Sequence, residues 1–128
     1  ELFKKSPIWG IGPKGFRHYC RSVDYNPPKG VCSTHPHNFL IQIILETGLI
    51  GLIFYLFGLI FVIFKLFKVY HINNPVVKKN CFLIISVGLI VNFFPFVPNG
   101  NFFNNWISIT NYFYIGFYMF SYKQVFNS

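Results

Sequence analysis

Charged side chains are scarce in this sequence, acidic ones above all. Lys, Arg, Asp and Glu make up 11% of its 128 residues, whereas a water-soluble domain carries about a quarter. The acidic residues are Glu1, Asp24 and Glu46, and the cysteines also number three. So few cysteines exclude a disulfide scaffold, and the uncharged stretch from Asn80 to Tyr122 excludes a disordered chain. A mean hydropathy of +0.46 is typical of a protein whose solvent is lipid.

Basic side chains outnumber acidic ones by eleven to three, which gives a formal charge of +8. They lie mainly at the ends of apolar runs, the placement of membrane-flanking residues rather than of a nucleic-acid-binding surface. The chain begins at Glu1 within a hydrophilic segment. We therefore expect the C-terminal part of a longer polytopic protein, a part that is inactive alone.

Three apolar segments predict an all-α integral membrane fold with three transmembrane helices in residues 37–128. The first span covers residues 39–64 and reaches roughly 39 Å, enough to cross a hydrocarbon core of ~30 Å. The second covers about 81–97 and the third about 106–122, where several tyrosines weaken the apolar pattern. Residues 1–36 are rich in turn-forming Gly and Pro and are expected to form a loop outside the bilayer.

The distribution of Lys and Arg around the spans predicts their orientation. One side has Lys65, Lys68, Lys78, Lys79 and Lys123, and the other has Arg21 and Lys29, with Arg17 at its margin. The side richer in Lys and Arg is expected to face the cytoplasm. The loop of residues 1–36 is therefore predicted to lie on the outer side of the membrane.

The start of the first span carries the most informative pattern. Thr34 fits an N-cap and Pro36 a first-turn residue, so the helix is expected to begin here. His37 would then lie in the first turn, where the helix dipole favours an uncharged ring and free backbone N–H groups bind anions. A neutral base beside a phosphate-binding helix end suits a transferase that acts on a diphosphate-linked substrate.

The same helix carries two further patterns. Asn38, Gln42 and Glu46 follow one another at intervals of four and form a polar stripe, which is expected to face protein or water rather than lipid. His37 and Gly48, eleven residues apart, lie on a second stripe with Gly51 close by. Glycine at such positions lets a neighbouring helix approach closely.

These motifs carry a resemblance to a known family. His37-Asn38, followed by Gly48-Leu-Ile-Gly51, resembles the His-Asn…Gly-x-x-Gly signature of the O-antigen ligase family. The same signature is shared by its relatives, the O-antigen polymerases and the protein O-oligosaccharyltransferases. Upstream, the stretch ending in Phe16-Arg17 resembles the Gly-x-Gly…Phe-Arg opening of the family's large periplasmic loop. With the two later apolar segments, the similarity extends over nearly the whole chain.

The resemblance implies a multi-pass protein of the bacterial inner (plasma) membrane whose active-site loop faces the periplasm. It implies an inverting, metal-independent and cofactor-free transfer of a glycan from undecaprenyl diphosphate to an acceptor hydroxyl, that of the lipid A core in lipopolysaccharide biosynthesis. His37 would take the proton from the acceptor hydroxyl or orient it, and Arg17 would stabilise the diphosphate leaving group. The signature also contains Asn38, for substrate binding, and Gly48 and Gly51, for helix packing. Two further substrate-binding candidates come from the residues themselves: His35 lies two residues from His37, and Glu46 is an ionisable residue at membrane depth.

Other interpretations stay open at several of these residues. His37 is alternatively an interfacial residue satisfied by a neighbour, and Arg17 a loop arginine that pairs with Asp24. Cys20 and Cys32 lie in the predicted periplasmic loop, where a disulfide is permitted. Their separation lacks the close spacing of a zinc knuckle, so no metal site is expected.

Two rival functions also stay open. An O-antigen polymerase would use the same donor with a growing glycan as its acceptor. A membrane transporter would line a substrate path with Glu46 and its polar stripe, but the second and third spans carry no charge, which speaks against transport.

Overall fold

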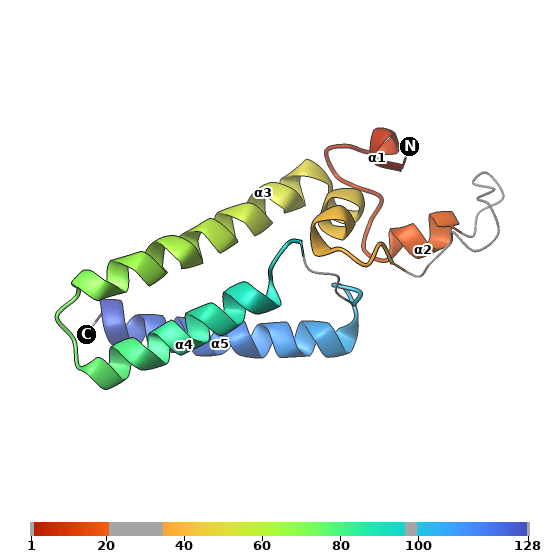
Figure 1. The fold of residues 1–128 in the computed structure, drawn as a ribbon. Coiled ribbons are helices and arrows are strands. Elements are labelled where there is room, and N and C mark those ends of the chain that lie inside the picture. The colour runs from red at the N-terminus through yellow and green to blue at the C-terminus, as the bar shows by residue number, and fades with distance from the viewer. Residues whose placement is uncertain (1, 21–34, 97–99, 128) are drawn as a thin grey trace. The chain divides into compact units, whose positions relative to one another are not determined.

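The computed structural model describes residues 2–20, 35–96 and 100–127 (Figure 1). Within these ranges the regular structure is helical and contains no β-strand, so the prediction of an all-α fold is confirmed. The elements in chain order are α1 (Leu2–Lys5), α2 (Gly15–Cys20), α3 (Phe39–Lys68), the 3-10 turn η1 (Val69–His71), α4 (Val76–Asn92) and α5 (Asn105–Phe126).

The chain is divided into two compact units. The first comprises residues 1–55 and 95–107, and the second comprises residues 56–94 and 108–128. Helix α3 therefore contributes its N-terminal part to the first unit and its C-terminal part to the second, and α5 is divided in the same way near its start.

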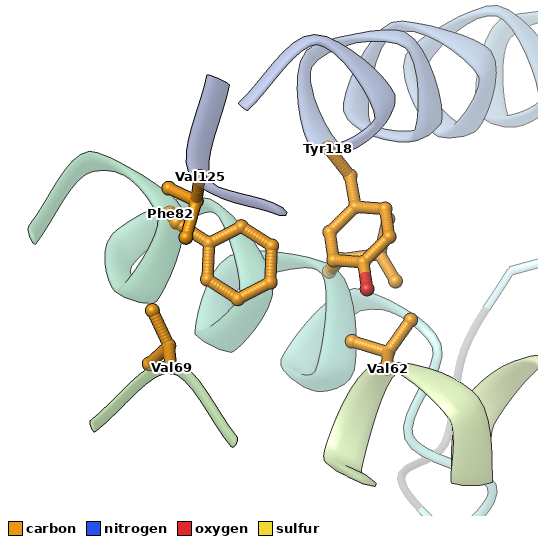
Figure 2. Packing of buried hydrophobic residues seen from close by; sticks show 6 residues of the cluster. Val62, Val69, Phe82, Tyr118 and Val125 are labelled. Carbon is orange, nitrogen blue, oxygen red and sulfur yellow. The ribbon is translucent and has the colours of Figure 1, made fainter. Parts of the chain in front are cut away.

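The second unit is a small helical bundle around an aromatic core. Phe82 of α4 is fully buried, and its ring centroid lies 5.4 Å from that of Tyr118 and 5.4 Å from that of Phe126, both in α5. Val62 of α3 and Val69 of η1 complete the packing (Figure 2). These contacts hold the last turns of α3 against the helical hairpin that follows.

Helices α4 and α5 run antiparallel in this unit and are joined by polar contacts. The Asn92 amide donates to the Asn111 side-chain oxygen at 2.6 Å, at the end of α4 opposite the Phe82 contacts. Lys65 donates to the Tyr122 hydroxyl at 2.9 Å and lies 4.8 Å from the centroid of the Phe126 ring. Such bonds satisfy polar side chains that the packing of the helices removes from solvent.

Among the described residues, one helical run is long and apolar enough to cross a bilayer, Phe39–His71 of α3 and η1. Only 6% of its most apolar 18-residue window is buried, as expected for a helix that faces lipid. Helix α4 begins at Val76, directly after Pro75, and its 17 residues are short for a span. Helix α5 is longer, but its Tyr, Asn and Ser residues make it less apolar. Three transmembrane helices are thus a proposal rather than a finding.

Candidate functional site

Helix α3 is broken at Gly48, which has φ 68° and ψ −164° (Figure 1). A break leaves backbone carbonyls and N–H groups without their usual helical partners. Residues 7–12 of the same unit lie in this break and supply new partners on both sides. The bonds are Ile11 N to Leu45 O at 2.9 Å, Gly12 N to Glu46 O at 3.0 Å, Leu49 N to Pro7 O at 3.0 Å and Ile50 N to Ile8 O at 3.4 Å.

Two glycines permit this close contact between backbones. Gly10 and Gly48 both have positive φ, +73° and +68°, a region that glycine adopts without cost. A Cβ on Gly10 would lie 2.6 Å from the Gly48 nitrogen, and a Cβ on Gly48 would overlap the Ile8 carbonyl. In this unit the neighbour of Gly48 is therefore the segment 7–12. A Cβ on Gly51 would meet Thr47 of its own helix, and the packing role of Gly51 stays a prediction.

The Glu46 carboxylate is buried, with 1% of the residue exposed, and it accepts hydrogen bonds from the start of α2. Its donors are the backbone N–H groups of Lys14 at 2.9 Å and Phe16 at 3.3 Å, and the Gln42 amide at 3.2 Å. The first N–H groups of a helix have no intrahelical acceptor, so this carboxylate caps α2 from another element. It thereby fixes the backbone immediately before Arg17.

Gln42 lies one turn before Glu46, is equally buried, and holds a second loop. Its amide donates to the Asn101 side-chain oxygen at 2.7 Å, and its own oxygen accepts from the Phe102 N–H at 2.9 Å. The Asn101 oxygen also accepts from the Phe103 N–H at 2.9 Å. Adjacent turns of α3 therefore anchor two segments that are far apart in the sequence, 14–16 and 101–103.

Residues in and beside these two segments, together with residue 35, line a pocket of about 540 Å³ in the first unit. Its lining residues are Lys14, Arg17, His35, Gly100, Asn101, Asn104, Asn105, Trp106 and Ile107. We name Lys14, Arg17 and His35 the cationic wall, and Asn101, Asn104, Asn105 and Trp106 the amide wall. The pocket thus combines side chains that bind phosphate oxygens with side chains that bind hydroxyl groups.

The placement of His37 in the first turn of the helix is wrong. Helix α3 begins at Phe39, and the Asn38 side-chain oxygen accepts from the Ile41 N–H at 3.1 Å, which makes Asn38 the N-cap. His37 precedes the cap with φ 56° and is exposed. Its ring centroid lies 4.1 Å from that of His35, at an interplanar angle of 51°. His37 is therefore joined to the pocket through His35. The predicted cap, Thr34, lies outside the described residues.

Of the predicted site residues, Arg17 and His35 meet in the pocket, and Glu46 lies behind it as a buried anchor. Sequence reasoning missed Lys14 and the whole amide wall, because local spacing does not show which distant segments meet. A signal was present in the run of asparagines at 99, 101, 104 and 105 next to Trp106. The possible Cys20–Cys32 disulfide falls partly outside the described residues.

Comparison with known proteins bears directly on this unit. Residues 1–56 match the family model for O-antigen ligase. The predicted resemblance to the O-antigen ligase family is thereby confirmed. The matched range contains the cationic wall, the broken part of α3 and the buried Gln42 and Glu46. No curated protein and no solved structure matched the chain.

The O-antigen ligase match supports a ligase-type or polymerase-type function in general. It implies a glycosyltransferase-like, membrane-associated enzyme whose partners are, in general terms, a lipid-linked glycan and a lipid acceptor. The candidate span within α3 agrees with membrane association.

Proposed function

We propose that the intact protein transfers a glycan from undecaprenyl diphosphate to a hydroxyl of the lipid A core, on the periplasmic face of the bacterial inner membrane. The observation that carries this proposal is the pocket in which Arg17, Lys14 and His35 gather inside the family-matched region. Three cationic or titratable side chains around one space suit a substrate with a diphosphate group.

In the proposed reaction Arg17 binds the diphosphate as it departs from the sugar. A guanidinium offers a planar pair of donors to phosphate oxygens and keeps its charge at every physiological pH. Lys14 adds a second positive charge in the same pocket. Because these side chains carry the charge stabilisation that grows in the transition state, the proposed reaction is independent of a metal ion.

His37 is the proposed base that takes the proton of the acceptor hydroxyl. Its ring lies against His35, which lines the pocket, so an acceptor can reach the donor sugar from the side of the histidines. Attack on the face opposite the departing diphosphate inverts the configuration at the anomeric carbon. Among the other motif residues, Asn38 is proposed to orient His37 by capping α3 next to it.

Glu46 is proposed to act on the substrate through other groups. Its carboxylate accepts from the backbone of Lys14 and Phe16, and so holds the segment that carries Arg17. A direct contact between Glu46 and substrate stays a prediction.

The pocket also supports the proposal of three membrane spans. Residues 14–17 and 100–107 line one pocket, so they lie on one side of the membrane. If α3 leaves that side, α4 must return to it before residue 100, and α5 then crosses again. The excess of Lys at residues 65, 68, 78, 79 and 123 favours the cytoplasm for the opposite side.

The test of the proposed base is His37→Ala in the full-length protein, with His71→Ala as its control. Both histidines are exposed, and His71 lies in η1 of the second unit. We expect His37→Ala to abolish glycan transfer at unchanged protein level and thermal stability, and His71→Ala to retain it. Transfer at the wild-type rate in His37→Ala would remove His37 from the mechanism.

The acceptor is identified by complementation in cells. The intact gene is introduced into a strain without O-antigen ligase and into one without O-antigen polymerase, and lipopolysaccharide banding is compared. Restored attachment in the ligase-deficient strain alone supports the proposal. Restored banding in the polymerase-deficient strain alone would assign the polymerase reaction instead, and glycan on protein would assign O-oligosaccharyl transfer.

A further inference from the structure

The amide wall supplies four of the nine residues that line the pocket, and the proposed reaction has so far given it no role. Asn101, Asn104 and Asn105 carry side-chain amides, and Trp106 is 80% exposed. The Asn101 oxygen already accepts from Gln42 and Phe103. The Asn104 oxygen accepts from the Trp106 N–H of the backbone at 3.1 Å, which holds the start of α5. These side chains are neutral groups that can form hydrogen bonds without supplying a charge.

A sugar ring matches this combination of groups. Its hydroxyls both donate and accept hydrogen bonds, as side-chain amides do, and its C–H face is an apolar surface that packs on an aromatic ring. Binding sites for small molecules are lined mainly by apolar and aromatic side chains, and a few well-placed polar groups give them their specificity. No charged side chain belongs to this wall, which separates its chemistry from that of Lys14 and Arg17.

The two walls are held at a fixed separation by α3. Glu46 holds the backbone of Lys14 and Phe16, and Gln42, one turn earlier and bonded to Glu46, holds Asn101. The two walls are therefore linked to each other through one buried, hydrogen-bonded pair of side chains.

We infer that the amide wall is the subsite for the donor sugar that is bonded directly to the diphosphate, with Trp106 as the surface on which this sugar packs. The inference rests on the proposed function, which places the diphosphate at the cationic wall. It assigns to Trp106 and its asparagines the choice of which lipid-linked glycan is accepted.

The experiment compares two lipids on the full-length protein in nanodiscs, undecaprenyl diphosphate without sugar and the glycan-bearing donor extracted from the source cells. The variant is Trp106→Ala, and the control is Trp9→Ala, which removes an indole that is 74% exposed and outside the pocket lining. We expect Trp106→Ala to weaken binding of the glycan-bearing lipid about tenfold and to leave the sugar-free lipid unchanged. Trp9→Ala should bind both lipids as the wild type does.

A conservative variant separates a sugar contact from a loss of structure. Trp106→Phe keeps an aromatic face and should recover most of the affinity for the glycan-bearing lipid. The proposed sugar subsite would be contradicted if Trp106→Ala lost the same affinity for both lipids. It would also be contradicted if this variant bound both lipids with wild-type affinity.

A second variant separates this inference from the proposed function. Arg17→Ala should weaken the binding of both lipids to the same degree, because both carry the diphosphate. Wild-type binding of both lipids by Arg17→Ala would contradict the proposed diphosphate site, whereas a selective loss in Trp106→Ala would still support the sugar subsite.

Discussion

At the scale of single residues, the site depends on two buried polar side chains rather than on the exposed ones that would do the chemistry. Gln42 and Glu46 are each 1% exposed, whereas Arg17 and His37 lie at the surface of the unit. A buried amide or carboxylate is costly unless its hydrogen bonds are satisfied. Both side chains meet this demand with backbone groups of distant segments, and this couples the stability of α3 to the shape of the pocket.

The predicted consequence is a large effect of Gln42→Ala. The substitution removes the acceptor of the Phe102 N–H. It also removes the Gln42 amide that donates to the Asn101 oxygen and to the Glu46 carboxylate. Leaving such groups buried without partners is expected to cost about 3 kcal/mol in the free energy of unfolding. Thermal and denaturant unfolding of the full-length protein in detergent measures this cost.

Gln124→Ala is the matched control, because Gln124 of α5 is exposed. It should change the free energy of unfolding by no more than about 0.5 kcal/mol. Equal effects of the two substitutions would mean that the Gln42 bonds contribute nothing to the fold.

The residue pattern predicted part of this network and could not predict the rest. The spacing of Asn38, Gln42 and Glu46 indicated a polar stripe facing protein or water rather than lipid, and the structure buries Gln42 and Glu46 in protein. Their partners Lys14 and Asn101 are far away in the sequence, so local spacing carries no information about them. The predicted helix start was wrong because the sequence offers two possible caps. Thr34 and Asn38 both fit an N-cap, and in the structure it is Asn38 that caps α3.

A second residue-scale prediction concerns the form of the positive charge at position 17. Arg17→Lys conserves the charge but loses the planar pair of donors that suits phosphate oxygens. We expect the specificity constant kcat/KM for glycan transfer to fall by at least about tenfold, with unchanged protein stability. Turnover at the wild-type rate would assign Arg17 to the structure of the loop instead.

At the scale of elements, the main difference between sequence and structure is the break in α3. An apolar run from residue 39 to residue 64 predicts one continuous helix, and glycine within such runs is common in membrane helices. The break needs a partner segment to satisfy the freed backbone groups, and residues 7–12 provide it. Irregular backbone inside a membrane protein is tolerated where protein or a water-lined cavity surrounds it, as in the discontinuous helices of transporters.

Gly48→Ala tests the break, with Gly58→Ala in the same helix as its control. Alanine at position 48 must adopt a positive φ and overlaps the Ile8 carbonyl, whereas a Cβ at position 58 meets nothing within 4 Å. We expect Gly48→Ala to destabilise the protein by about 3 kcal/mol. Gly58→Ala should be neutral or stabilise it by up to about 1 kcal/mol. Similar unfolding temperatures for the two variants would favour a continuous α3.

At the scale of the whole molecule, composition and helix count lead to different statements about the membrane. Low charge and three apolar segments predict three spans. Among the described residues, one helix is long and apolar enough to cross a bilayer when it is judged by its own length and composition. The second and third helices are less apolar because they carry polar groups that pair with each other, such as Asn92 with Asn111. Hydrogen bonds between side chains of neighbouring helices allow helices with some polar residues to span a bilayer. A hydropathy average along one helix does not count such bonds.

Labelling of single cysteines decides between one span and three. In a protein with Cys20, Cys32 and Cys81 replaced by serine, the positions Lys4→Cys, Asn73→Cys, Asn104→Cys and Lys123→Cys are each exposed in the structure. With three spans, a membrane-impermeant maleimide added to spheroplasts should label positions 4 and 104. Positions 73 and 123 should react only after the membrane is permeabilised. Position 104 is decisive, because crossing by α3 alone would leave it on the same side as position 73. Protection of position 104 in intact spheroplasts would contradict the three-span arrangement and the shared pocket that supports it.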